Sequence, residues 1–232
     1  MYGIWILLLL IATAALPAII VFLWFRSKNS PVTLPWFLIS LVAGIISLVI
    51  AAMIQDFVPA SGGDGLGSIF FSIFVRIALV EELSRIVVLV PLLIAVKHRR
   101  NHCDTIDLPF AAALGFVAGV GFSILESAFH GMTDIKVILL RAFTVAPLHG
   151  ACGIRVGAAM AFFAGKNWVK AVFIFLSAVF IHGAYNLTIV SPALSSVLAV
   201  LIAFTALFSS LPYLKAAGRD DENIVIPTEL KP

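Results

Sequence analysis

The chain contains few charged residues. Only 12% of its 232 residues are Asp, Glu, Lys or Arg, whereas 62% are hydrophobic, which lies far outside the range of soluble globular proteins. The hydrophobic residues form long runs without the period-two alternation of β-barrel strands, so we expect an all-α, polytopic membrane helical bundle in a lipid bilayer. The net charge of +3 gives no indication of a nucleic-acid partner, and we expect none.

Cysteine is also scarce. The two copies, Cys103 in a loop and Cys152 within an apolar segment, are too ill-matched to form a disulfide framework. The sequence has no CxxC pair, Gly-rich phosphate loop or nucleotide fingerprint, which argues against redox-motif and nucleotide-dependent enzymes. No basic residue precedes the first apolar run, which is about as long as a full membrane span, so we interpret it as a retained helix rather than a signal peptide.

Seven apolar segments divide the chain, and breakers rich in Gly, Pro or charge separate them. We predict a single transmembrane helical domain over residues 1–214 and a polar cytoplasmic tail over residues 215–232. The predicted spans cover approximately residues 3–25, 35–54, 68–96, 107–130, 136–165, 168–190 and 193–214.

The basic residues outside the spans fall mainly on one side of the predicted membrane. The loops after the first, third and fifth spans and the tail contain nearly all of them, whereas the opposite side contains only Lys136. Cytoplasmic loops of membrane proteins are enriched in Lys and Arg. We therefore predict an outside N-terminus and a cytoplasmic C-terminus, which requires an odd number of spans.

Ionisable residues inside the third segment are the main anomaly of the sequence. Glu81, Glu82 and Arg85 lie among Ile, Val and Leu, although one charged group at mid-bilayer costs about 2.5–3.5 kcal/mol. These side chains must therefore face partners or a water-filled cavity. On a helix, Glu81 and Arg85 are four residues apart and share a face, so we predict that they pair and that Glu82 stays freer for chemistry.

Three further polar clusters occur on the next three segments. They are Phe122-x-x-x-Glu126, Arg141 with Pro147-Leu148-His149-Gly150, and His182-x-x-x-Asn186. With a rise of about 1.5 Å per residue, the clusters could converge in the outer half of the membrane. Two histidines and one carboxylate could hold a zinc ion (Zn²⁺) with an open water position, and a nearby free carboxylate would be the general base. Metal-assisted hydrolysis is the reaction class that suits these residue types.

The same residues also allow other interpretations. A single membrane histidine, such as His149 or His182, more often forms a hydrogen bond between helices than binds metal, and Glu126 could simply pair with Arg141. A non-enzymatic proton or ion pathway, or a transporter, would use the same buried network, although the chain has no pair of broken helices in matching halves. Haem ligation by the two histidines would leave the adjacent glutamates without a purpose.

Taken in order, the four clusters resemble the motif set of the PrsW family of intramembrane proteases. That family is related to the CAAX prenyl endopeptidases and the bacteriocin-processing membrane proteases. The resemblance extends from about Arg76 to Ile189 and includes the unusual polar residues. Two positions depart from the family pattern: Arg85 stands where Lys is usual, and Ser127 follows Glu126 where Asn is common.

The resemblance implies an intramembrane protease that hydrolyses a peptide bond in or next to a membrane-anchored protein substrate. PrsW-like members are linked to signalling by cleavage of anti-sigma factors, which would place the chain in a bacterial inner membrane. The site residues it implies are catalytic Glu81, Glu82, Arg85 and Asn186, with Glu126, His149 and His182 around water or a metal ion. The resemblance leaves open whether the hydrolase is of metallo- or glutamic type.

Overall fold

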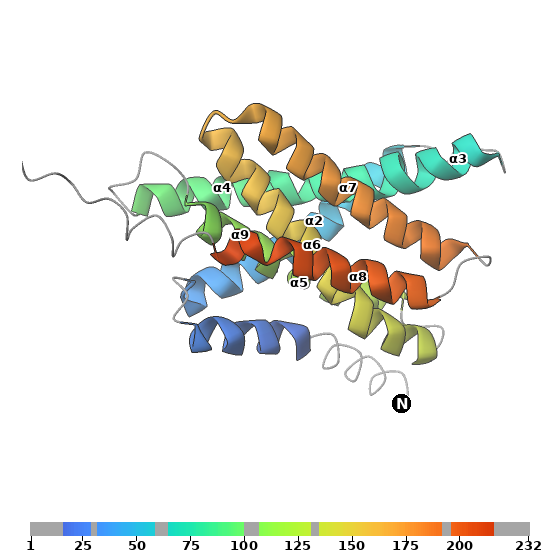
Figure 1. Cartoon of the computed structure of the whole chain (residues 1–232), viewed down its shortest axis with the longest axis horizontal. Coiled ribbons are helices and arrows are strands. Elements are labelled where there is room, and N and C mark those ends of the chain that lie inside the picture. The colour runs from blue at the N-terminus through green and yellow to red at the C-terminus, as the bar shows by residue number, and fades with distance from the viewer. Residues whose placement is uncertain are drawn as a thin grey trace, which may run out of the picture.

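The computed structural model describes residues 16–28, 32–58, 65–99, 107–130, 135–191 and 196–215. All regular structure within these ranges is helical, which confirms the predicted fold class. The helices are Leu16–Ser27, α2 (Leu34–Phe57), α3 (Leu66–Phe70), the π-helical η1 (Phe71–Leu79), α4 (Val80–Arg99), α5 (Leu108–His130), α6 (Ile135–Ala164), α7 (Trp168–Val190), α8 (Ser196–Ser210) and α9 (Pro212–Lys215) (Figure 1).

Five described helices are long and apolar enough to cross a membrane. They are Leu34–Phe57, Leu108–Phe129, Phe143–Ala164, Trp168–Val190 and Val197–Lys215, which match five of the seven predicted spans. The predicted third span corresponds to α3, η1 and α4, which follow one another without a break, and its charged residues keep it out of this group. The first predicted span lies partly outside the described residues. The count of seven and the orientation stay predictions.

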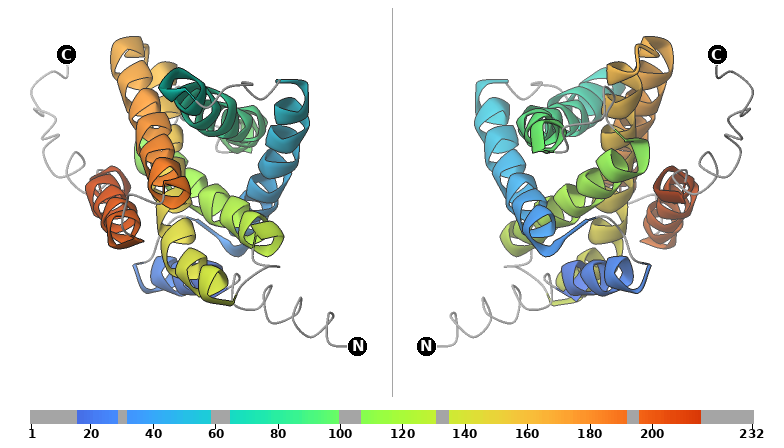
Figure 2. Two further views of the ribbon diagram at one scale, coloured as in Figure 1. Left: turned by 90° about the vertical axis from the view of Figure 1, so that its right-hand side faces the viewer. Right: turned by 90° about the vertical axis from the view of Figure 1, so that its left-hand side faces the viewer.

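The long helix formed by α3, η1 and α4 lies between two walls of the bundle. In the end-on views of Figure 2, α2 lies on one side of it, α7 on the other, and α5 crosses beneath. Direct contacts join α2 to α4, η1 to α7, and α5 to both α2 and α6. The segment that carries Glu81 and Glu82 therefore faces the helices that carry the other polar clusters.

Glycine residues bring the backbone of α5 against its neighbours. A Cβ atom added at Gly119 would collide with the carbonyl oxygen of His149 on α6, and one added at Gly115 would collide with that of Gly153. On the opposite face, a Cβ added at Gly121 would collide with the carbonyl oxygen of Leu41 on α2. Small residues allow this close approach of membrane helices. The backbone around His149 is thus fixed relative to α5.

Arg76 ties η1 to the end of α2. Its Nε donates to the carbonyl oxygen of Val58 at 2.8 Å, and a terminal nitrogen donates to the carbonyl oxygen of Gln55 at 2.9 Å. Carbonyl groups at the end of a helix lack partners within that helix, so a basic side chain stabilises them. The contact closes the gap between α2 and the long helix just before Glu81.

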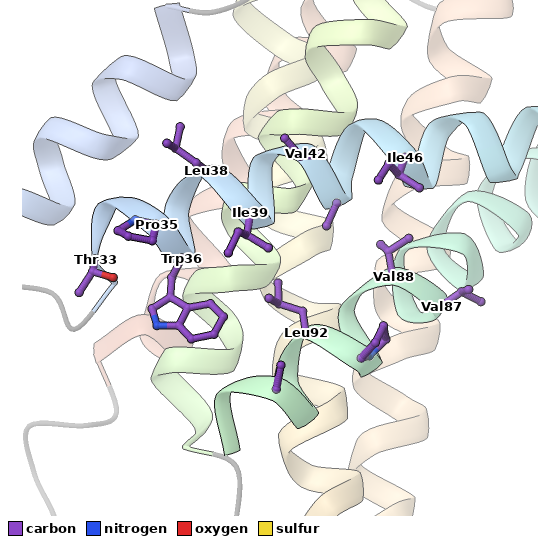
Figure 3. Close-up of a pocket in the computed structure, with 13 residues that line it drawn as sticks. Thr33, Pro35, Trp36, Leu38, Ile39, Val42, Ile46, Val87, Val88 and Leu92 are labelled. Carbon is purple, nitrogen blue, oxygen red and sulfur yellow. The ribbon is translucent and has the colours of Figure 1, made fainter. Parts of the chain in front are cut away.

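Beyond this contact, α2 and α4 enclose an apolar groove of about 830 Å³ (Figure 3). Trp36 and Ile39 line it from α2, and Val88 and Leu92 line it from α4. A second groove of about 470 Å³ lies on another side of α4, against α6 and α7. Because both grooves are apolar, they suit hydrocarbon chains or apolar side chains rather than water.

Candidate active site

Four helices bring the predicted clusters together. Glu81 and Glu82 lie in the first turn of α4, Glu126 lies on α5, His149 on α6 and His182 on α7. The two imidazole rings are nearly perpendicular, with centroids 4.8 Å apart, and each ring contacts a carboxylate. The clusters therefore converge as predicted, whereas their depth in the membrane stays a prediction.

Glu82 binds a histidine with one oxygen and an arginine with the other. Its Oε1 lies 2.8 Å from Nδ1 of His182, and its Oε2 accepts a hydrogen bond from Arg85. The predicted pairing of Arg85 with Glu81 is thus wrong. Neighbours on a helix face are three as well as four residues apart, and Arg85 also lies 3.2 Å from Nδ1 of His149, which directs it toward Glu82.

Glu126 forms a matching arrangement with His149. Its Oε1 accepts from Arg141 at 2.5 Å, and its Oε2 lies 2.7 Å from Nε2 of His149. An arginine can only donate hydrogen bonds, so Nδ1 of His149 accepts from Arg85 and Nε2–H donates to Glu126. Each histidine consequently has its own carboxylate, and each of these two carboxylates has its own arginine.

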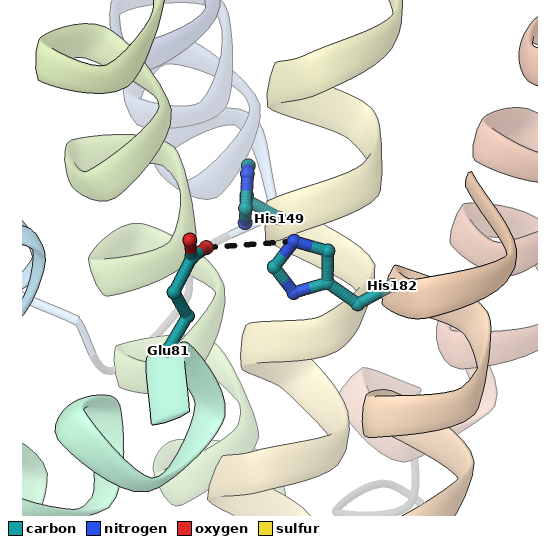
Figure 4. A group of neighbouring side chains, drawn as sticks. All are labelled: Glu81, His149 and His182. Carbon is teal, nitrogen blue, oxygen red and sulfur yellow. Dashed lines mark ion pairs between the residues drawn. The ribbon is translucent and has the colours of Figure 1, made fainter. Parts of the chain in front are cut away.

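Glu81 differs from Glu82 and Glu126 because only one of its two oxygens has a hydrogen-bond partner among the described residues. Gln55 donates from Nε2 to Oε1 of Glu81 at 3.2 Å. The other oxygen, Oε2, is buried and has no hydrogen-bond partner among the described residues. It lies 3.4 Å from Nε2 of His182, the contact drawn as a dashed line in Figure 4.

Glu81, His149 and His182 form a group with the spacing of metal ligands, which we call the metal-type group. One ligand atom from each lies within 4.8 Å of the others, and all three residues are buried (Figure 4). The sequence prediction named Glu126, rather than Glu81, as the carboxylate beside the two histidines. Glu126 instead contacts His149 from the side, so that it holds a histidine of the group.

The residues of this group fit a divalent metal ion. Two imidazoles and one carboxylate are a ligand set of catalytic zinc sites, which leave a fourth position open. Oε2 of Glu81, without a hydrogen-bond partner in the described ranges, is the second sign, because a buried acceptor without a partner is costly unless a cation or a donor satisfies it. Charge is the third: Glu82 and Glu126 form ion pairs with Arg85 and Arg141, whereas Glu81 forms none with an arginine or lysine in the described part of the chain.

Asn186 and Phe122 flank the centre in different ways. Asn186 lies one helical turn beyond His182, is half-buried, and makes no side-chain hydrogen bond with the described residues. Phe122 is fully buried: its ring centroid lies 4.7 Å from that of His149 and 4.8 Å from the Arg85 guanidinium carbon. The ring of Phe122 therefore forms a wall of the site and contacts a cation.

Two polar contacts of the site region were not predicted from the sequence. Gln55 lies near the end of a hydrophobic helix, where polar residues are common, so the sequence does not indicate its contact with Glu81. The hydroxyl of Tyr185 lies 2.6 Å from that of Thr144 and joins α7 to α6 close to both histidines. Tyr185 falls between His182 and Asn186, and its full burial is visible only in the structure.

Two arginines lie outside the paired network. Arg85 and Arg141 form ion pairs with glutamates of the site, whereas Arg76 and Arg155 bind other groups. Arg76 binds backbone carbonyls, and Arg155 donates to the hydroxyls of Ser210 and Ser209 at 2.8 and 2.9 Å.

Cys152 forms no hydrogen bond or ion pair with the ionisable residues of the site among the described residues. It is buried, and its thiol contacts the carbonyl oxygen of Ala178 at 3.6 Å. Cys103 lies outside the described residues.

Comparison with protein families shows what this chain is similar to. The model of the PrsW family of intramembrane metalloproteases matches residues 32–211, which is most of the chain and includes all four polar clusters. The chain belongs to the PrsW family. Comparisons with curated proteins and with solved structures gave no match. The resemblance seen in the motifs is therefore confirmed, and this PrsW-family protein is an intramembrane protease, hence a hydrolase of membrane proteins.

Proposed function

We propose that this PrsW-family protein is an endopeptidase that hydrolyses its substrate at a metal centre formed by Glu81, His149 and His182. The observation that carries the proposal is the buried Oε2 of Glu81, which has no hydrogen-bond partner among the described residues and lies 3.4 Å from Nε2 of His182 in a metal-type group. When bound, the metal ion, for which zinc is our choice, supplies a Lewis acid that polarises the peptide carbonyl and makes water more acidic.

The carboxylates around the histidines prepare them to bind. Glu82 engages Nδ1 of His182 and leaves Nε2 directed toward Glu81. Such contacts fix the orientation and tautomer of a ligand histidine. Both nitrogens of His149 are engaged, by Arg85 and by Glu126, so His149 would have to give up one of these contacts to hold the metal ion.

Glu81 is the carboxylate that faces the reacting water. Both oxygens of Glu82 are engaged, by Arg85 and by His182, whereas Oε2 of Glu81 has no hydrogen-bond partner among the described residues. A carboxylate oxygen has two lone-pair sites, so Oε2 of Glu81 could hold the metal ion with one and accept the proton of the water with the other. Asn186 has an amide without a partner in the described part of the chain. We propose that this amide donates a hydrogen bond to the carbonyl oxygen of the scissile bond.

The substrate that we propose is a membrane-anchored protein of the anti-sigma-factor type. The family resemblance supports this substrate class and a bacterial inner-membrane location. The excess of basic residues on one side of the predicted spans supports an outward-facing site, since the rise per residue predicts that the clusters converge in the outer half of the membrane. No observation favours the alternative of a transporter or ion pathway.

Metal analysis of the purified protein tests the metal centre. We expect one bound ion per chain in the wild type and loss of that ion in His182→Ala, because His182 offers the imidazole nitrogen nearest the free oxygen of Glu81. His98→Ala is the matched control, since His98 is exposed at the end of α4. Full cleavage activity after complete removal of metal by a chelator would contradict the metal centre and point to a glutamic-type hydrolase.

Gly183→Ala tests whether activity depends on the position of η1 relative to α7. A Cβ atom at Gly183, next to His182, would collide with the ring of Phe74 on η1, so the variant should push η1 and the following glutamates away from α7. A displacement of about 1 Å can cost about 100-fold in rate, and we expect a loss of kcat/KM of that order. Cleavage assays should show partial recovery in Gly183→Ala with Phe74→Leu, which makes room for the methyl group. Wild-type activity in the single variant would contradict the prediction.

A further inference from the structure

We infer that Gln55, at the end of α2, is a positioning residue that determines which oxygen of Glu81 faces the reaction. The inference rests on the proposed function of Glu81. Gln55 lies outside the four polar clusters, on a helix that carries none of them. Its side chain nevertheless contacts a residue of the metal-type group directly, from Nε2 to Oε1 of Glu81 at 3.2 Å.

The contact makes the two oxygens of Glu81 different. A carboxylate only accepts hydrogen bonds, so the amide nitrogen of Gln55 must be the atom that faces it. With Oε1 engaged in this way, the planar carboxylate directs Oε2 toward Nε2 of His182, where no donor satisfies it among the described residues. Glu has several rotatable side-chain bonds, so without an anchor the carboxylate could turn to other rotamers.

Gln55 is itself held by the helix that it helps to orient. Its backbone carbonyl accepts from Arg76 at 2.9 Å, and Arg76 also binds the carbonyl oxygen of Val58. Arg76 lies in η1, which continues without a break into the first turn of α4 and Glu81. The backbone of Gln55 is thus bound to one point of the long helix, and its side chain to another. This closed set of contacts is the support that a precisely placed ligand requires.

A purely structural role for Gln55 makes different predictions. If the contact only joined α2 to α4, its loss would lower the thermal stability of the metal-free protein and leave metal affinity and kcat unchanged. A positioning role has the opposite signature. Metal affinity and kcat fall, KM changes little because a positioning residue acts through Glu81 rather than on the substrate, and the metal-free protein keeps its stability.

The experiment uses the full chain in detergent or nanodiscs with Zn²⁺ as the probe. Gln55→Met keeps the length of the side chain but removes the donor, and Gln55→Ala is a second variant without a new apolar contact. Contacts of this kind are worth about 10–100-fold in metal affinity or activity, so we expect both variants to lose Zn²⁺ affinity and kcat by that factor. Asp56→Asn, an exposed neighbour on the same turn, should behave as wild type.

Wild-type Zn²⁺ affinity and kcat in both Gln55 variants would overturn the inference. A fall in metal-free stability with unchanged affinity and kcat would also overturn it and assign Gln55 to helix packing. Failure of the proposed function has a separate signature, because the wild type itself would then bind no metal, or His182→Ala would remain active. A wild type that binds Zn²⁺ beside unaffected Gln55 variants contradicts only the role of Gln55.

Discussion

Glu81→Gln is expected to lower kcat for cleavage of a membrane-anchored substrate by about 10²–10⁴-fold, the contribution usual for a general acid–base group. The amide keeps the size of the side chain but cannot accept the proton of the attacking water. Its oxygen can still accept from Gln55, and its nitrogen can donate toward Nε2 of His182. The variant should therefore accumulate in the membrane at the wild-type level, which immunoblotting checks beside the kinetic assay.

The control for this prediction is Asp56→Asn, which makes the same kind of change at an exposed acid. His182→Ala should be as inactive as Glu81→Gln, because it removes both the proposed metal ligand and the partner of Glu82. Wild-type activity in a Glu81→Gln/Glu82→Gln double variant would contradict hydrolysis at this site altogether.

Arg85→Met is expected to destabilise the protein by about 3–5 kcal/mol, the usual cost of breaking a buried ion pair by removing one partner. The side chains of Arg85 and Glu82 are both 0% exposed, so the variant would leave the Glu82 carboxylate buried without its cation. Reversible unfolding in mixed micelles gives the free energy of unfolding, and the membrane level gives a second measure.

A second substitution identifies the partner of Arg85. Arg85→Met with Glu82→Gln removes both charges and should recover most of the stability, although not the activity, because His182 loses its carboxylate. Arg85→Met with Glu81→Gln removes the carboxylate that the four-residue spacing favours, and it should recover none. Recovery in this second combination would contradict the Glu82–Arg85 pair.

The sequence was sufficient to predict the all-helical class and the meeting of four clusters. Long apolar runs fix the helices, and charged groups inside them must find partners, which is why Glu126 and His149 could be placed near each other. These arguments depend only on the high cost of an unpaired polar group in a membrane. They need no knowledge of how the helices cross.

The sequence was not sufficient to predict which atoms meet. Arg85 has a glutamate both three and four residues before it, and only packing against His149 decides between them. For the same reason, Glu81 rather than Glu126 completes the metal-type group. Gln55 is invisible to a search for anomalies, because a polar residue near a helix end needs no partner in a membrane. The π-helical geometry of η1 likewise has no signature in its residues.

The contact between Gly119 and the carbonyl oxygen of His149 determines how the site tolerates sequence change. Main-chain atoms have the same dimensions in every protein, so a ligand located by such contacts does not depend on the shapes of surrounding side chains. Apolar residues elsewhere in the core can be exchanged for others of similar volume without moving His149. A methyl group added at Gly119, by contrast, would collide with the carbonyl oxygen of His149 and displace it. The positions of the site residues should therefore tolerate substitutions in most of the core, but not substitutions at a few glycines.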